Sequence, residues 1–179
     1  MSEEQRARFL HNIAADAQRL HRLTERLMEL TRAEIHTPDS EPFKLAEVIE
    51  ESVRAYSEQV AIDTNGVSAG AIAFGQPDAL NAVLEVLFEN AIQHHANQVT
   101  VWAQEDSGGV DLFVRDDGGG ISDANRAKVF DPFFTTEREQ GGTGLGLTIA
   151  TALLKQTHGE LRLDGGDGPT TFRITLRGA

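Results

Sequence analysis

Cysteine is absent from this chain of 179 residues, and so are long apolar runs. Without cysteine there is no disulfide framework, no thiolate metal site and no cysteine nucleophile. No run approaches the roughly 20 apolar residues of a transmembrane helix. The acidic start at Glu3 and Glu4 is unlike a signal peptide. The sequence therefore predicts a soluble protein, and its length is enough for one good core.

Basic residues are scarce outside the N-terminal part of the chain. The formal charge is −12, and residues 1–34 hold six arginines and six acidic residues, whereas the remainder holds 22 acidic and 10 basic side chains. A nucleic-acid-binding protein needs a positive face, and this distribution argues against one. A bound triphosphate would have to be neutralised mainly by backbone N–H groups and a divalent cation.

Two glycine clusters are the most distinctive feature of the sequence. The first, 116–120, is Asp-Asp-Gly-Gly-Gly and follows an alternating apolar run; the second, 141–147, opens an apolar-periodic segment. Glycine lets backbone N–H groups approach a ligand closely, and a helix N-terminus favours an anionic phosphate. The spacing matches neither common phosphate motif. Either cluster alone would also suit a tight turn, but together they predict a nucleotide site.

Hydrophobic periodicity predicts mixed helices and strands without strict βαβ alternation, and hence an α+β fold with helices on one sheet face. Asp78, after Pro77, is a candidate N-cap. The predicted helices cover 8–34, 45–56, 78–95 and 145–158, and the predicted strands cover 60–62, 71–75, 99–104, 110–115, 161–163 and 171–176.

The first predicted helix has an apolar stripe wider than that of a two-stranded coiled coil, which is typical of a helical bundle. It therefore needs a partner helix outside this chain, or a second copy, unless it packs on the rest of the domain. His11 and His21 lie on this helix. Either one suits a phosphoacceptor, a ligand or, most simply, a solvent-facing position.

Four blocks, in order, resemble the catalytic and ATP-binding domain of sensor histidine kinases, within the superfamily that includes gyrase-type and chaperone-type ATPases. Residues 87–91 are similar to the N box, 116–120 to the first glycine box, 130–133 to the F box and 142–147 to the second glycine box. The resemblance runs from about residue 43 to the C-terminus. It implies a Bergerat-type two-layer α/β sandwich with a mixed sheet.

The resemblance also implies a domain organisation. Residues 1–36 are similar to the second helix of the dimerisation and phosphotransfer hairpin, 37–42 would be a linker and 43–179 the ATP-binding domain. The acceptor helix is not recognisable, because His11 lacks the acidic residue and proline that follow the acceptor. We expect a piece of a longer kinase in the cytoplasm, whose partners are the parent's acceptor helix, a response-regulator receiver domain and a second copy.

Roles in ATP binding and catalysis follow from the resemblance and from side-chain chemistry. Asn90 would offer a carbonyl oxygen to Mg²⁺, and Glu89 would accept the proton of the attacking imidazole. Asp116 would accept a hydrogen bond from the adenine amine. His94 and Arg138 would contact ribose or phosphate, although each equally suits a solvated surface. The remaining predicted ATP-site residues are Gly118, Gly120, Ile121, Phe133, Gly142, Thr143, Gly144, Leu145, Gly146, Leu147 and Thr148.

Two positions depart from the family pattern. Val86 stands where the family often has a second asparagine, and Gln93 stands where it often has lysine. Both changes remove polar contacts near Mg²⁺ and phosphate. Two alternatives to a histidine kinase therefore stay open: a nucleotide-binding regulatory module without turnover, and a serine kinase of the anti-sigma-factor type.

Overall fold

The structure is a computed structural model, and it describes residues 41–106, 108–137, 142–164 and 168–177. The predicted helix over 8–34, the region 1–36 and the two histidines on it lie outside the described residues. Among the residues that are described, no helix combines the length and the hydropathy needed to cross a membrane.

A mixed five-stranded sheet forms one layer of the domain, with strand order β2-β4-β5-β7-β6. Strand β2 pairs in parallel with β4, and the other neighbours are antiparallel. Alternating sequences place one side chain in two on the helix side of the sheet, as the buried Val99 and Val101 of β4 show. The strands are β2 (Ala61–Gly66), β4 (Gln98–Asp106), β5 (Gly109–Asp116), β6 (Glu160–Asp164) and β7 (Thr171–Arg177).

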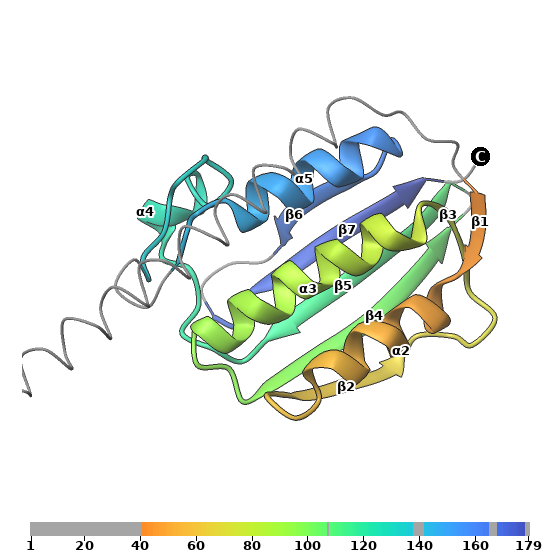
Figure 1. Cartoon of the computed structure of the whole chain (residues 1–179), viewed down its shortest axis with the longest axis horizontal. Coiled ribbons are helices and arrows are strands. Elements are labelled where there is room, and N and C mark those ends of the chain that lie inside the picture. The colour runs from red at the N-terminus through yellow and green to blue at the C-terminus, as the bar shows by residue number, and fades with distance from the viewer. Residues whose placement is uncertain (1–40, 107, 138–141, 165–167, 178–179) are drawn as a thin grey trace, which may run out of the picture.

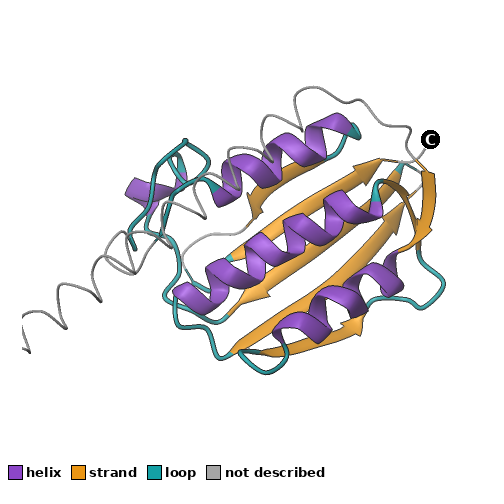
Figure 2. Ribbon diagram, viewed as in Figure 1, coloured by secondary structure: helices purple, strands orange, loops and turns teal. Residues whose placement is uncertain are grey.

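Three helices cover one face of this sheet: α2 (Leu45–Tyr56), α3 (Pro77–Gln93) and α5 (Gly146–Gln156) (Figure 1). Their apolar stripes meet the sheet in a single core, in which Leu84, Phe88, Leu112 and Ile174 are fully buried. In Figure 2 the purple helices lie in front of the orange strands, so the view is onto the covered face of the sheet. This arrangement confirms the predicted α+β fold with helices on one face of a mixed sheet.

Some local predictions were wrong. Strand β3 (Ile72–Gly75) does not join the main sheet, because it pairs with β1 (Glu41–Lys44) in a separate two-stranded sheet. Strand β1 was not predicted and takes in two residues assigned to the linker. Asp78 is not the N-cap of α3, because the helix begins at Pro77, whose missing N–H is no loss at a first helical position. The short helix α4 (Asp123–Arg126) was also missed.

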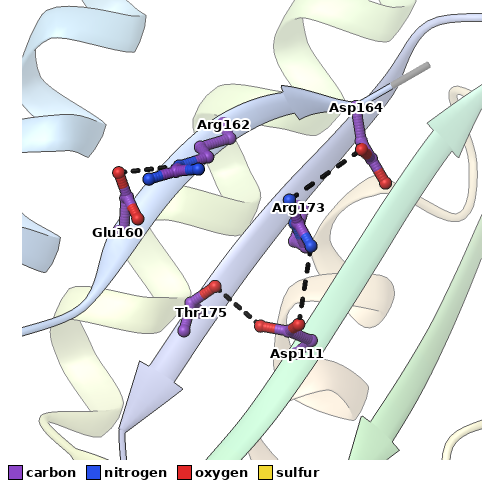
Figure 3. Close-up of polar contacts among 6 residues, drawn as sticks. All are labelled: Asp111, Glu160, Arg162, Asp164, Arg173 and Thr175. Carbon is purple, nitrogen blue, oxygen red and sulfur yellow. Dashed lines mark hydrogen bonds and ion pairs between the residues drawn. The ribbon is translucent and has the colours of Figure 1, made fainter.

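The other face of the sheet carries polar and aromatic side chains that contact one another. Trp102 stacks on Phe113 with ring centroids 5.0 Å apart, and Phe113 pairs with Arg173 on β7. The Arg173 guanidinium lies between Asp111 and Asp164, at 3.8 and 4.0 Å (Figure 3). Thr175 donates to Asp111 at 2.6 Å. These contacts link β5, β6 and β7 on the face of the sheet that is turned away from the helices.

Candidate functional site

A cavity of about 370 Å³ opens between the C-terminal end of α3, the loop after β5, the segment before α5 and the first turn of α5. Both glycine clusters contribute to its wall, although they are separated by more than twenty residues in the sequence. The predicted site residues that line it are Asn90, His94, Asp116, Gly120, Ile121, Gly142, Thr143, Gly144, Gly146 and Leu147.

Asp116 forms the buried end of this cavity. It is the last residue of β5 and is 8% exposed. Its Oδ1 accepts a hydrogen bond from the Gly118 N–H at 3.0 Å, and its own N–H donates to the Thr170 carbonyl at 3.0 Å. Burial raises the pKa of the Asp116 carboxyl, while the bond from Gly118, the nearby His94 and the Thr170 hydroxyl oppose this rise. The result is a preorganised hydrogen-bond acceptor in a partly desolvated position.

Thr170 is a cavity residue that the sequence prediction missed. Its side chain is 8% exposed and hydrogen-bonds to Asp116. The signal lies in strand pairing, since Arg115 opposes Thr171 in the β5–β7 ladder and the next residues along are therefore Asp116 and Thr170. Because no sequence pattern showed that these two strands are neighbours, Thr170 could not be placed next to Asp116 in advance.

The C-terminal end of α3 is attached closely to the first glycine cluster. Asn90, Gln93 and His94 all face the cavity from this last turn. The His94 carbonyl accepts a hydrogen bond from the Gly119 N–H at 3.3 Å. A Cβ on Gly118 would lie 2.7 Å from that same carbonyl oxygen, so this position requires glycine. Gly118 thus packs against the end of α3 and is not among the residues that line the cavity.

Asp117 fastens the same two segments from outside the cavity. Its Oδ1 accepts hydrogen bonds from the backbone N–H groups of Asn97 at 2.7 Å and Gln98 at 2.9 Å. Its own N–H donates to the Gln98 carbonyl at 3.2 Å. The bonds from Gln98 and Asn97 lower the pKa of the Asp117 carboxyl from its ordinary value of 3.8. The exposed Asp117 is therefore a clamp between the start of β4 and the glycine loop.

Replacing Asp117 by alanine is expected to lower stability and to do so in a pH-dependent way. A lowered pKa means that the ionised form favours the folded state, so the stabilisation is present above pH 3.8 and is lost as the pH falls through the folded-state pKa. Chemical denaturation at several pH values should show the wild type losing its advantage over D117A in acid. D117N, which keeps an acceptor oxygen, should lie between the two. An advantage independent of pH would contradict the clamp.

The second glycine cluster shapes the opposite end of the cavity. Gly144 has a φ of +68°, and its carbonyl accepts a hydrogen bond from the Phe133 N–H at 2.8 Å. A Cβ there would lie 2.6 Å from the Phe134 carbonyl oxygen. Helix α5 begins directly afterwards at Gly146, so the unpaired N–H groups of its first turn and its dipole face the cavity. This end is suited to an anion.

The segment between the F box and the second glycine cluster closes the cavity wall with Phe134, Thr135, Thr136 and Glu137. None of these four was predicted from the sequence. Phe134, and not the predicted Phe133, faces the cavity, while Phe133 has a φ of +66° and is 57% exposed. Arg138, for which a phosphate contact was predicted, lies outside the described residues.

Three further predicted site residues are not brought to the cavity wall. The Glu89 carboxylate lies against α2, where the Tyr56 hydroxyl donates to its Oε1 at 3.5 Å. Leu145 is 2% exposed and belongs to the interior, at the N-cap of α5. The Thr148 hydroxyl donates to the Phe130 carbonyl at 3.4 Å and so ties α5 to the F box. Leu145 and Thr148 therefore support the start of α5 and do not line the cavity.

Comparison with known proteins places the chain in one family. The profile of the histidine kinase-, DNA gyrase B-, and HSP90-like ATPases matches residues 75–179. The chain is 31% identical over 180 residues to the probable sensor histidine kinase HK of Mycobacterium tuberculosis (strain CDC 1551 / Oshkosh), an alignment that covers 97% of this chain and 47% of that protein.

Two further relatives extend the comparison. Identity to the sensor histidine kinase CpxA of Escherichia coli (strain K12) is 36% over 95 residues, which covers 51% of this chain and 21% of CpxA. The solved structure of the mycobacterial sensor histidine kinase MprB superposes with a TM-score of 0.66 at 28% identity, covering 77% of this chain and 97% of that one.

The chain spans about half or less of the curated relatives that it matches. Within that span, the family profile covers more than half of the chain and takes in both glycine clusters and the end of α3. The cavity is built where these matched segments meet. The chain therefore belongs to the family of histidine kinase-, DNA gyrase B- and HSP90-like ATPases, and its relatives within that family are sensor histidine kinases.

Proposed function

We propose that this chain is the catalytic domain of a two-component sensor histidine kinase, which binds Mg²⁺·ATP and presents the γ-phosphate to a histidine outside this chain. The observation that carries the proposal is the cavity itself. It has a buried carboxylate at one end and glycine backbone at a helix N-terminus at the other. Among the described residues that line it, none is lysine or arginine.

The buried end suits adenine. A carboxylate accepts hydrogen bonds and, when ionised, cannot donate them, so Asp116 favours a base edge that presents an amine. The Thr170 hydroxyl lies next to it and can donate or accept. Ile121 and Leu147 add apolar contact surface along the same wall. We infer that the base is held by Asp116 and packed between these side chains.

The open end suits phosphates with a divalent cation. Cβ atoms on Gly142 and Gly144 would collide with the neighbouring backbone, so these positions keep the wall thin enough for close approach of a ligand. Mg²⁺ prefers oxygen ligands and keeps several waters, and the Asn90 side-chain oxygen is such a ligand at the cavity wall. Bound there with ATP, Mg²⁺ would neutralise phosphate charge during transfer.

The residues of the chain would then position the γ-phosphate for in-line attack. Phosphoryl transfer depends mainly on positioning and charge stabilisation, which the backbone N–H groups before α5 and the dipole of that helix supply. Glu89, adjacent to Asn90 on α3, is our candidate for the base that receives the imidazole proton. Its hydrogen bond with Tyr56 would hold the carboxylate on the α2 side of α3, where an incoming helix could reach it.

The partners and the domain organisation belong to the same proposal. Residues 1–36 would be the second helix of a dimerisation hairpin, 37–42 its linker and 43–179 the kinase domain. The complete parent would dimerise through that hairpin and pass the phosphate to a response-regulator aspartate in the cytoplasm. The similarity to a sensor histidine kinase along 97% of this chain supports these assignments.

Incubation with γ-labelled ATP and Mg²⁺ tests the proposal. The chain alone is expected to bind ATP without acquiring label. A version extended by the acceptor helix of its own parent is expected to acquire acid-labile, alkali-stable label, as a phosphohistidine would. Label that appears on the unextended chain, or that resists acid in the extended one, would contradict the transfer that we propose.

A second function is favoured by one observation, namely that the cavity lacks two polar groups common in the family. Val86 is 9% exposed and packs in the core, while Gln93 lies in the cavity wall. These residues suit a regulatory module that binds nucleotide without turnover. ATP binding with no label in the extended chain would favour this second function.

A further inference from the structure

A second acidic side chain, besides Asp116, lies in the wall of a cavity whose α5 end is suited to anions. Glu137 is part of the cavity wall, and its side chain is 24% exposed. A triphosphate placed beside a carboxylate is repelled by it, and a partly desolvated position strengthens that repulsion. Neither cavity shape nor the need to bind phosphate explains an acidic residue at this position. A cation between the carboxylate and the phosphates would explain it.

Both backbone groups of Glu137 are hydrogen-bonded, so the position of its Cα is well defined. The Glu137 N–H donates to the Thr135 hydroxyl at 3.1 Å, and the Glu137 carbonyl accepts from the Gly142 N–H at 3.0 Å. A Cβ on Gly142 would lie 2.9 Å from the Glu137 carbonyl oxygen, so glycine is what allows this approach. The backbone that carries this carboxylate is therefore held in place within the wall.

The contacts of the carboxylate leave it available to a ligand. Within the described part of the chain, the imidazole of His94 lies beside this carboxylate, with its Nδ1 3.8 Å from the Glu137 Oε1. This distance is too long for a hydrogen bond. His94 lies one helical turn after Asn90, and all three side chains line the same cavity. An amide side chain from α3 and a carboxylate from the segment before the second glycine cluster thus line one cavity.

We propose that Glu137 is a second protein ligand of the divalent cation, in addition to Asn90, so that ATP binding by this chain depends unusually strongly on the metal. The inference rests on the proposed function, since the cation enters with the nucleotide. Carboxylate and amide oxygens are both ligands that Mg²⁺ accepts while keeping several waters. Without the cation, the same carboxylate opposes the phosphates.

Isothermal titration of the whole chain with ATP, in Mg²⁺ and in EDTA, tests this with a prediction of opposite sign in the two conditions. The variant Glu137→Gln should bind ATP more tightly than wild type in EDTA, because the repulsion is removed. In Mg²⁺ it should bind more weakly, because a neutral amide oxygen replaces the charged carboxylate as the ligand of the cation. The dissociation constant in EDTA divided by that in Mg²⁺ should therefore be about tenfold smaller for the variant than for the wild type. This is the order of loss seen when a group that supports a metal ion is removed.

A matched variant controls for net charge. Glu58→Gln removes the same charge at an exposed position after α2, and its ratio should equal that of wild type. In a second measurement with Mn²⁺ and oxygen-17-labelled water, Glu137→Ala, which has no side-chain oxygen, should add one water to the metal bound with ATP. Equal tightening of Glu137→Gln in both conditions, or an unchanged water count, would overturn the proposal and leave the proposed function intact. Absence of ATP binding by the wild type would overturn both.

Discussion

Replacing Asp116 by asparagine is expected to abolish detectable ATP binding while the domain stays folded. The Asp116 Oδ1 already accepts the Gly118 N–H. An asparagine that kept this bond would turn its NH₂ group toward the base, where adenine also presents an amine. A charge-assisted hydrogen bond is worth about 1.5–3 kcal/mol, so its loss alone is roughly 10- to 150-fold in Kd. Two facing donors add to that loss.

The same substitution is expected to leave the protein at least as stable as the wild type at neutral pH. Burial raises the pKa of Asp116 above its ordinary value of 3.8. The protonated form therefore favours the folded state, and this contribution is lost as the pH rises through the folded-state pKa. D116N carries no charge there, so any advantage in thermal stability at pH 7 should shrink as the pH is lowered. Differential scanning fluorimetry over pH measures this.

The nucleotide itself supplies the control for D116N. Inosine triphosphate presents an oxygen where ATP presents the amine, so it can accept from the asparagine NH₂. We expect the wild type to prefer ATP and D116N to prefer inosine triphosphate. Equal ATP binding by wild type and D116N would show that Asp116 does not contact the base.

Replacing Gly144 by alanine is expected to disrupt the phosphate end of the cavity. The φ of +68° alone costs a residue with a side chain about 1–2 kcal/mol. The added Cβ would also lie 2.6 Å from the Phe134 carbonyl oxygen and 2.7 Å from its nitrogen. To relieve these contacts, the hydrogen bond from Phe133 to Gly144 must break. We expect ATP affinity to fall by at least roughly tenfold, as measured by calorimetry.

Gly70 is the matched control for this change. Its added Cβ would meet nothing nearer than the Ser68 hydroxyl oxygen at 3.9 Å, and Gly70 is exposed. Gly70→Ala should leave both ATP affinity and thermal stability close to those of the wild type. If Gly144→Ala behaved in the same way, the tight turn before α5 would not shape the site.

The sequence was most informative where local pattern and glycine content agree. The alternating residues before Asp116 predicted the strands at 99–104 and 110–115, which are present as β4 and β5 and pair from Val99 with Asp116 to Asp106 with Gly109. The apolar periodicity of α3 predicted its buried face, including Leu84 and Phe88. Because helix and strand periods are set by local geometry, these elements could be placed without knowledge of the tertiary structure.

What the sequence did not reveal depends on contacts between distant segments. Thr170 lies at the site because β7 pairs with β5. Strand β3 pairs with β1 and not with the main sheet. Phe134 and not Phe133 lines the cavity, and Phe133 has a left-handed φ, which is rare for an aromatic residue and which no sequence pattern indicated. The two hydrogen bonds of Asp117 at the start of β4 could not be predicted either, because in the sequence Asp117 is an ordinary turn residue.

The claim on which the account depends is that this cavity binds ATP together with a divalent cation, through main-chain N–H groups and few cationic side chains. Calorimetric titration of the unmodified chain with ATP at millimolar Mg²⁺ tests it most directly. We predict one nucleotide per chain, with affinity that falls sharply when EDTA replaces Mg²⁺. No heat of binding in Mg²⁺, or binding equally tight in EDTA, would contradict the account.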